Sequence, residues 1–281
     1  ESSGLPIVHH SKYVCDLPAN HRFPMAKFPR VLHCLLQDQV ITERQVWVPE
    51  IASKDLLGTV HTEDYLNNFI SGRINEQEQR RTGFPWGTVL AAEVALQRGL
   101  ACSTAGGTHH AFPSYGSGFC LLNDLAVAAK YLMNSSSRKR KVLIVDLDVH
   151  QGDGTAFIFK DEPSVFTFSV HCGKNFPVRK QQSDLDISVE DGLEDKEYLS
   201  THLPWLLETF RPDLLLYDAG VDPHWEDELG RLRLTDQLYQ RDLYVMKTVV
   251  KRGIPIATVI GGGYSRDINK LALRHSIVHR A

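Results

Sequence analysis

Short apolar, β-branched runs alternate with longer amphipathic segments along the chain. The short runs are typical of buried strands, and the segments with helical periodicity are typical of helices packed on a core. The expected strands cover residues 6–8, 100–104, 141–146, 164–170, 214–217 and 255–260. The expected helices cover residues 28–37, 53–69, 87–98, 122–134, 195–210, 235–252 and 266–279. This alternation predicts one three-layer α/β/α domain over residues 1–281, with helices on both faces of a mostly parallel sheet.

One expected strand leads directly into a dense group of polar side chains. The apolar residues 142–145 are followed by Asp146, Asp148, His150 and Asp153. In an open α/β sheet, ligands bind outside the carboxyl ends of the strands, and alternation along an extended chain places the first three on one side. A turn with routine Asp and Gly residues is the simpler interpretation, but it does not explain three carboxylates and an imidazole so close together. The segment therefore predicts metal ligands at an active site.

Three further expected strands end near residues that can bind a metal or transfer a proton. They lead to the His109–His110 pair, to Asp222 and to Tyr264, with glycines in each of these loops. Alone, each has a common structural explanation: a histidine pair on the surface, an aspartate capping a helix, and a flexible glycine turn with a packed aromatic ring. Together, four loops with these residue types at one edge of the sheet predict a single active site.

The types of these residues indicate metal-assisted hydrolysis. A catalytic zinc ion takes three protein ligands and keeps one position open, and Asp148, His150 and Asp222 supply such a set. The same ligands would accept Fe²⁺. The ion would activate a water molecule for attack on an amide carbonyl.

Amide hydrolysis also needs a base, an acid and a donor to the developing oxyanion. His109 and His110 are the candidates for proton transfer, and Asp146 and Asp153 could orient them and raise their basicity. Tyr264 could donate its hydroxyl to the oxyanion opposite the metal.

Composition narrows the class of protein. The 281 residues carry a net charge of −3, which argues against a direct nucleic-acid binder, and no apolar run approaches the length of a membrane span. The five cysteines are odd in number and show no C-x-x-C spacing, so we expect reduced thiols and a cytoplasmic or nuclear location. The basic run 138–141 is favoured as a solvated loop over a nuclear localisation signal.

Six segments resemble the metal-dependent histone deacetylase family, which has the arginase–deacetylase fold. In the order of the family they are Gly-Gly-Thr-His-His-Ala (106–111), Gly-Phe-Cys (118–120), Asp-Leu-Asp-Val-His-Gln-Gly-Asp-Gly (146–154), Ala-Gly-Val-Asp-Pro (219–223), Leu-Gly-Arg-Leu-Arg-Leu-Thr (229–235) and Gly-Gly-Gly-Tyr (261–264). His61 also matches a pattern near the N-terminus of the family. The resemblance implies a zinc-dependent hydrolase that removes acetyl or longer fatty acyl groups from lysine side chains of histone or non-histone proteins.

The resemblance also implies roles for individual residues. The implied ligands of the zinc ion are Asp148, His150 and Asp222. His110 with Asp153 is the general base and acid, His109 with Asp146 is its electrostatic partner, and Tyr264 polarises the carbonyl. The resemblance further implies two sets of residues, one for a substrate tunnel and one for a structural potassium site that is formed partly by backbone carbonyls. They are Gly118, Phe119 and Phe176 for the tunnel, and Asp146, Asp148, His150, Ser169 and Val170 for the potassium ion.

Some positions depart from the larger eukaryotic classes of the family. Gln151 stands where those classes have a second histidine, and Thr108 stands where many have tryptophan. The segment 71–87 is short, and no acidic residue matches the one that grips the peptide backbone in class I enzymes. These departures favour class IV and bacterial-type members, and class IV members remove long fatty acyl groups.

Three alternative functions remain open. An acetylpolyamine or other small-molecule amidohydrolase would use the same chemistry, but no acidic gate at the entrance is recognised. An arginase-like binuclear hydrolase would need more carboxylate ligands. A non-catalytic acyl-lysine reader would be expected to have lost a catalytic residue. Nothing in the sequence predicts an oligomeric state.

Overall fold

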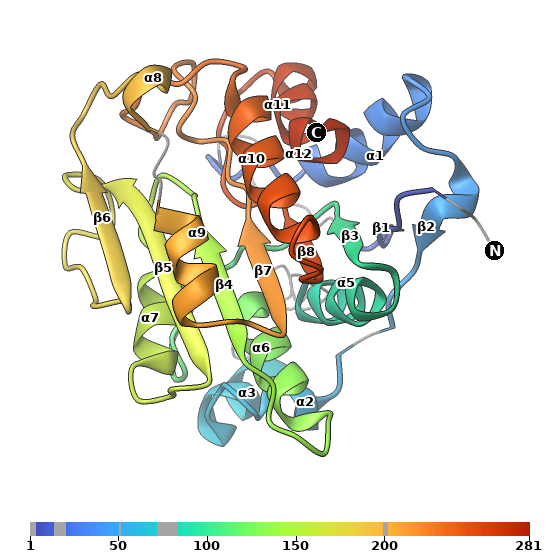
Figure 1. Ribbon diagram of the computed structural model, residues 1–281, viewed down its shortest axis with the longest axis vertical. Helices are drawn as coiled ribbons and strands as arrows, with labels where there is room; N and C mark the ends of the chain where they lie inside the picture. Colours follow the sequence, from blue (N-terminus) through green and yellow to red (C-terminus); the bar gives the residue numbers. More distant parts are fainter. Residues whose placement is uncertain (1–3, 14–20, 51, 72–83, 199–201) are drawn as a thin grey trace.

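Eight parallel strands form one sheet at the centre of the molecule (Figure 1). The computed structural model describes residues 4–13, 21–50, 52–71, 84–198 and 202–281. Neighbouring strands follow the order β2-β1-β3-β8-β7-β4-β5-β6, and every pair is parallel. The strands are β1 (Ile7–Val8), β2 (Val46–Trp47), β3 (Leu100–Ser103), β4 (Val142–Asp146), β5 (Val165–Cys172), β6 (Leu185–Val189), β7 (Leu214–Asp218) and β8 (Ile256–Val259). The predicted α/β fold is confirmed.

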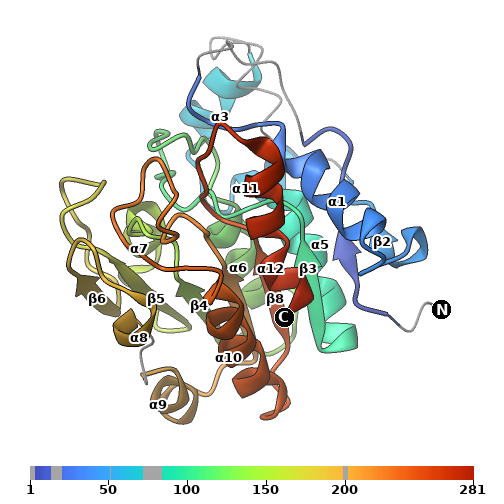
Figure 2. The same ribbon diagram turned by 90° about the horizontal axis from the view of Figure 1, so that it is seen from above.

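Helices cover both faces of this sheet (Figure 2). One face packs against α2 (Lys54–Leu57), α3 (Glu63–Ile70), α5 (Phe84–Arg98), α6 (Asp124–Asn134) and α7 (Asp153–Phe159). The other face packs against α8 (Asp195–Tyr198), α9 (His202–Thr209), α10 (Leu238–Val250), α11 (Ile268–His275) and α12 (Ile277–Arg280). Helix α1 (Lys27–Gln37) packs against α11 beside β1, and a 3₁₀ turn, η1 (Glu43–Gln45), precedes β2. None of the helices in the described ranges is long and apolar enough to cross a membrane.

The central strand β4 shows why its sequence is a continuous apolar run. Val142 and Ile144 belong to the core on one face, whereas Leu143 and Val145 belong to the core on the other. Successive side chains of a strand point to opposite faces, so a strand covered on both faces must be apolar at every position. This burial places the first polar residue, Asp146, at the carboxyl end of the strand.

The structure differs from the sequence prediction mainly at the edges and at helix breaks. Strands β2 and β6 were not predicted because one has two residues and the other carries polar side chains at an exposed edge. The helix expected over 53–69 is two helices, because α2 ends at Gly58 and the Thr62 side chain caps α3 by accepting the Tyr65 N–H. The helices expected over 195–210 and 266–279 are also divided. Helix α7 was not predicted, because it begins at Asp153 within the segment interpreted as ligands and no element was expected over its remaining residues.

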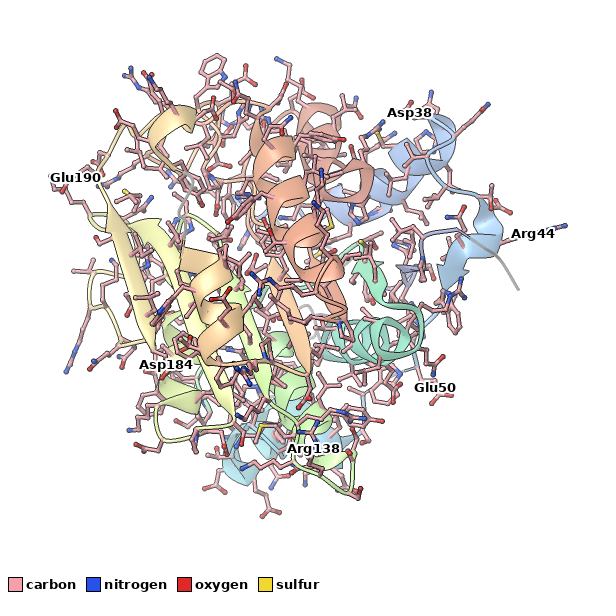
Figure 3. All side chains as sticks on the ribbon, viewed as in Figure 1. Asp38, Arg44, Glu50, Arg138, Asp184 and Glu190 are labelled. Atoms are coloured by element: carbon pink, nitrogen blue, oxygen red, sulfur yellow. The ribbon has the colours of Figure 1, made fainter. Side chains whose placement is uncertain are left out.

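The basic run 138–141 is an exposed loop, in agreement with the sequence interpretation. Arg138 forms an ion pair with Asp213 at 2.6 Å, and Lys139 forms one with Glu162 at 2.9 Å. Figure 3 shows Arg138 below the sheet, near the start of the strands, on the opposite side from Glu190.

Candidate active site

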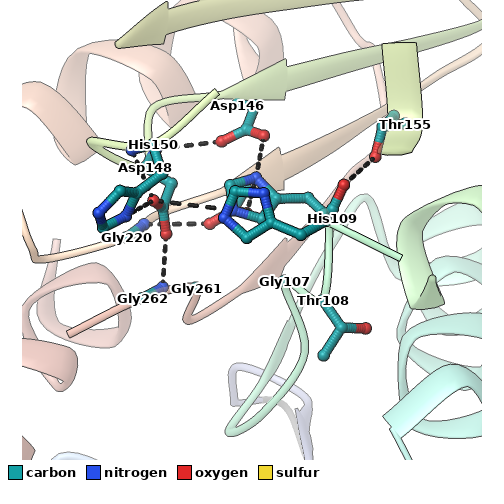
Figure 4. Close-up of polar contacts among 12 residues, drawn as sticks. Gly107, Thr108, His109, Asp146, Asp148, His150, Thr155, Gly220, Gly261 and Gly262 are labelled. Carbon is teal, nitrogen blue, oxygen red and sulfur yellow. Dashed lines mark hydrogen bonds and ion pairs between the residues drawn. The ribbon is translucent and has the colours of Figure 1, made fainter. Parts of the chain in front are cut away.

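The four loops predicted to carry the site follow four neighbouring strands. Strands β3, β8, β7 and β4 are adjacent in the sheet, so the loops after them meet at one edge although they are far apart in the sequence. Figure 4 shows Gly107 and His109 from the first loop, Asp146 and His150 from another, and Gly220 and Gly261 from the remaining two. The structure therefore brings the predicted site residues together.

Asp148, His150 and Asp222 form a compact group of ligand atoms. Nδ1 of His150 lies 3.2 Å from Oδ1 of Asp148 and 3.1 Å from Oδ2 of Asp222. All three side chains are buried. Ligand atoms about 2.0–2.1 Å from a tetrahedral zinc ion lie about 3.3 Å apart, so this spacing suits one such ion.

Backbone groups hold the two carboxylates in place. The Gly262 N–H donates to Oδ2 of Asp148 at 2.7 Å, and the Val149 N–H donates to Oδ1 of Asp222 at 2.8 Å. Burial alone would lower the pKa of His150, but its hydrogen bonds to the two carboxylates raise that pKa to about 10. A positive charge is therefore favoured between the carboxylates, and the donor set fits a divalent cation.

The two adjacent histidines each contact a different carboxylate. Nδ1 of His109 lies 2.5 Å from Oδ2 of Asp146, and Nδ1 of His110 lies 2.6 Å from Oδ1 of Asp153. The two imidazole rings are themselves in contact, with their centroids 4.1 Å apart. Each Nδ1 therefore has a fixed partner, which leaves the Nε2 atoms as the groups available to a substrate.

The pKa values of the two histidines move in opposite directions. Burial opposes the charged form of His109, but the charges of Asp146 and Asp148 outweigh it and raise the pKa of His109 well above its ordinary value. Burial and the charge of His109 together lower the pKa of His110 to about 4. Pairs of titratable groups whose pKa values are driven apart are typical of acid–base sites. At neutral pH this leaves His110 free to accept a proton beside a protonated neighbour.

Tyr264 lies beside the metal ligands and lines the same cavity as His109 and His110. Its ring is 6.2 Å from that of His150, and its backbone N–H donates to Oδ2 of Asp227 at 2.8 Å. Burial and the charge of Asp148 raise the pKa of Tyr264 well above its ordinary value. The phenol therefore remains a hydrogen-bond donor at neutral pH.

Aromatic side chains surround the approach to this centre. The predicted wall residue Phe176 is 39% exposed, and its ring packs edge-on against that of His110 at 4.9 Å. Phe119 lies 5.9 Å from the ring of Tyr264. Gly118 packs closely against two of these side chains, because a Cβ atom there would be 2.5 Å from His110 and 2.8 Å from Phe176. The three predicted tunnel residues therefore lie together.

One wall residue was not predicted from the sequence. The ring of Phe23 is 5.8 Å from that of Phe119 and 6.5 Å from that of Tyr264. Together these three side chains line a cavity of about 20 Å³. It comes from the N-terminal segment, where no motif marks it.

Two buried charged residues that hold the site loops were also missed. Asp124, at the start of α6, accepts hydrogen bonds from the backbone N–H groups of Gly107 and Thr108. Lys27, at the start of α1, donates to the carbonyls of Gly261 and Gly263 at 3.3 and 3.4 Å. Both resemble ordinary helix-terminal residues in the sequence, and only an unusual burial distinguishes them.

A third carboxylate, besides those of Asp146 and Asp148, lies near His109. Asp218 is fully buried, and its Oδ2 lies 3.7 Å from Nδ1 of His109 without a hydrogen-bond partner. The sequence placed Asp218 at a strand end but gave it no role. Burial and the charge of Asp146 raise the pKa of Asp218 well above its ordinary value, which favours a neutral carboxyl group there.

The predicted potassium ligands lie on the neighbouring strands β4 and β5 and in the loop that follows β4. Asp146 is directly opposite Ser169 in the parallel ladder, and Val170 follows. The Ser169 hydroxyl lies 2.9 Å from Nδ1 of His171. The potassium site stays a prediction.

Comparison with known proteins gives the family of this chain. Residues 21–279 match the family described as "Histone deacetylase domain". The chain is 51% identical over 296 residues to an uncharacterized protein of Picosynechococcus sp., covering 99% of this chain and 98% of that protein. It is 30% identical over 294 residues to Histone deacetylase 2 of Arabidopsis thaliana, covering 94% of this chain and 76% of that protein. The crystal structure of the HDA15 HD domain has the same fold, with a TM-score of 0.82, 22% identity, and coverage of 97% of this chain and 89% of that one. The chain therefore belongs to the histone deacetylase family of hydrolases.

Proposed function

We propose that this protein is a metal-dependent hydrolase that removes a short acyl group from a lysine side chain. The observation that carries the proposal is the pair of adjacent buried histidines, His109 and His110, each held by its own carboxylate beside a three-ligand cluster. With a cation on that cluster, such a site would hold a base, a fixed positive charge and a Lewis acid at one point, as amide hydrolysis requires.

Asp148, His150 and Asp222 would hold the cation, and zinc suits their number and spacing. Fe²⁺ would suit the same ligands. When bound, the ion would polarise the amide carbonyl and lower the pKa of a water molecule to about 7.

The remaining steps belong to the side chains around this cluster. His110 takes a proton from the attacking water and returns it to the departing lysine amine, while Asp153 fixes its tautomer. His109, kept protonated by Asp146, stabilises the negative charge that develops on the substrate. The Tyr264 hydroxyl donates a hydrogen bond to the oxygen of the former carbonyl.

The shape of the site supports a short acyl group on an extended amine. Phe119 and Phe176 flank the approach, as suits the methylene chain of lysine. The cavity beside Phe23 and Tyr264 measures about 20 Å³, which is room for about one water molecule and leaves no space for a long fatty acyl chain in this conformation.

A substrate panel tests the proposal directly. The purified protein, loaded with zinc or Fe²⁺, would be assayed with lysine peptides carrying acyl chains from acetyl to myristoyl, and with acetylated polyamines. We expect the highest kcat/KM for acetyl-lysine peptides. Preference for the free polyamine would favour a small-molecule amidohydrolase, and no turnover of any substrate would contradict the proposal.

A further inference from the structure

Gln151 follows the metal ligand His150 directly, and its side chain is fully used in hydrogen bonds. Its Nε2 donates to the carbonyl of Gln181 at 2.7 Å and to Oδ1 of Asp186 at 2.9 Å. Its Oε1 accepts the backbone N–H of Gln181 at 2.9 Å. The residue is 1% exposed, so no water competes for these groups. The carboxamide thus pairs with both backbone groups of one distant residue.

The residue that Gln151 holds belongs to the same loop as the tunnel wall Phe176. Within this loop, Nζ of Lys180 donates to the carbonyl of Asn175 at 2.7 Å and also to the carbonyl of Pro177. Asn175 in turn donates from Nδ2 to the carbonyl of Leu229 at 2.9 Å. Residues 175–181 are therefore tied together, and Gln151 connects them to the loop that carries the metal ligands.

The position of this loop decides where the Phe176 ring lies. The ring is 4.9 Å from that of His110 and 6.3 Å from that of His150, and it lies close to Gly118. A shift of the loop would move the Phe176 ring relative to His110 and so change the width of the approach. A wall that grips a methylene chain depends on close contact, because dispersion falls off within an ångström.

We propose that Gln151 is a specificity-determining positioning residue, which fixes Phe176 at the distance that suits the extended side chain of an acyl-lysine substrate. This inference rests on the proposed function. Gln151 touches neither the substrate nor the reacting atoms, and it acts through the 175–181 loop. A side chain that only satisfied buried polar groups would affect stability, but it would not distinguish substrates that pass Phe176 from ligands that do not.

The test compares Gln151→Met with Gln182→Met. Methionine has nearly the same length as glutamine but forms none of the three hydrogen bonds. The exposed Gln182 lies in the same loop, and its side chain forms no hydrogen bond with the described residues. Gln151→His, which keeps one donor, provides a graded second variant in case the methionine protein does not fold. Each protein would be assayed for KM and kcat with an acetyl-lysine peptide, and for inhibition by acetohydroxamate, which lacks the methylene chain that passes Phe176.

We expect Gln151→Met to raise KM for the peptide about tenfold, with a smaller change in kcat and an unchanged inhibition constant for acetohydroxamate. Gln151→His should lie between this variant and the wild type, and Gln182→Met should match the wild type. In a double-mutant cycle, Gln151→Met should add little to the KM of Phe176→Ala, because both changes remove the same wall.

Two results would overturn the inference. Equal increases in the KM for the peptide and in the inhibition constant for acetohydroxamate would mean that Gln151 supports the metal centre instead of the wall. Additive effects with Phe176→Ala would mean that it acts independently of Phe176. If the wild-type protein does not hydrolyse the peptide while acetohydroxamate still binds, the proposed function fails instead.

Discussion

Replacement of Asp124 should damage both the stability and the activity of the protein, although this residue does not touch the substrate. Its carboxylate accepts the N–H groups of Gly107 and Thr108 at 3.0 and 2.7 Å, and the hydroxyls of Thr88 and Thr108 at 2.6 and 2.8 Å. These bonds fix the loop that continues into His109. The informative changes are Asp124→Ala and Asp124→Asn.

The size of the stability loss depends on which hydrogen-bond donors can find another partner. The Thr108 hydroxyl is also 2.6 Å from the carbonyl of Leu122, and the Thr88 hydroxyl can rotate, so neither is stranded in the alanine variant. The two backbone N–H groups have no such freedom. Each costs about 1–3 kcal/mol when buried without a partner, so Asp124→Ala should lower the free energy of unfolding by about 4 kcal/mol. Asparagine keeps one acceptor oxygen and should cost only about 1 kcal/mol.

Urea denaturation at neutral pH would measure both losses, and Thr88→Val would serve as the control. That control removes the Thr88 hydroxyl but keeps both backbone hydrogen bonds from the loop to Asp124, and it should cost about 1 kcal/mol while leaving kcat unchanged. The alanine variant should also lose activity under conditions where it remains folded, because the His109 loop is no longer held. Equal stability of the alanine and asparagine variants, or a wild-type kcat for Asp124→Ala, would refute the reasoning.

Three further predictions concern the site and its surroundings. Tyr264→Phe should lower kcat about 10²-fold with little change in stability, and full turnover by this variant in a steady-state assay would remove the tyrosine from the mechanism. Asp222→Ala should abolish metal binding, and elemental analysis that still finds a stoichiometric metal ion would exclude Asp222 as a ligand. Burial lowers the pKa of His61 from 6.5 to about 4. As the pH falls, the histidine of the unfolded chain therefore binds a proton before that of the folded protein does. The free energy of unfolding should fall as the pH drops from about 6.5 towards 4. Since Nε2 of His61 accepts the Asn123 N–H at 3.1 Å, His61→Gln should show a weaker decline between pH 7 and pH 5 in urea titrations, and an unchanged slope would assign the decline to other groups.

The central part of the fold was predictable because its strands are covered on both faces. Strand β4 must be apolar at every position, so Val142 to Val145 are recognisable in the sequence, and the polar residues after them mark the edge of the sheet. The edge strand β6 could not be recognised in this way. Its residues Leu185–Val189 are only partly covered, and the polar positions among them resemble a loop.

The same distinction separates the site residues that were predicted from those that were not. Asp148 and His150 are close in sequence, and their residue types alone suggest a ligand. Lys27 gains its role from contacts with Gly261 and Gly263, more than 200 positions away. Its amino group is buried, and burial lowers its pKa to about 8, but nothing in the local sequence distinguishes it from an exposed lysine at the start of a helix.

The strand order also has a consequence for how the protein folds. Because β4 and β7 are neighbours, Asp148 and Asp222 meet only after the chain between them has closed a long loop, and the His109 loop requires β3 and β8 in addition. Contacts of such sequence separation form slowly, and a fragment that lacks either β4 or β7 also lacks part of the ligand set. A cation that binds this site would therefore favour the folded protein over the unfolded chain. Its free concentration would raise the thermal midpoint of the whole molecule through mass action, so that metal supply and the lifetime of the folded protein would be coupled.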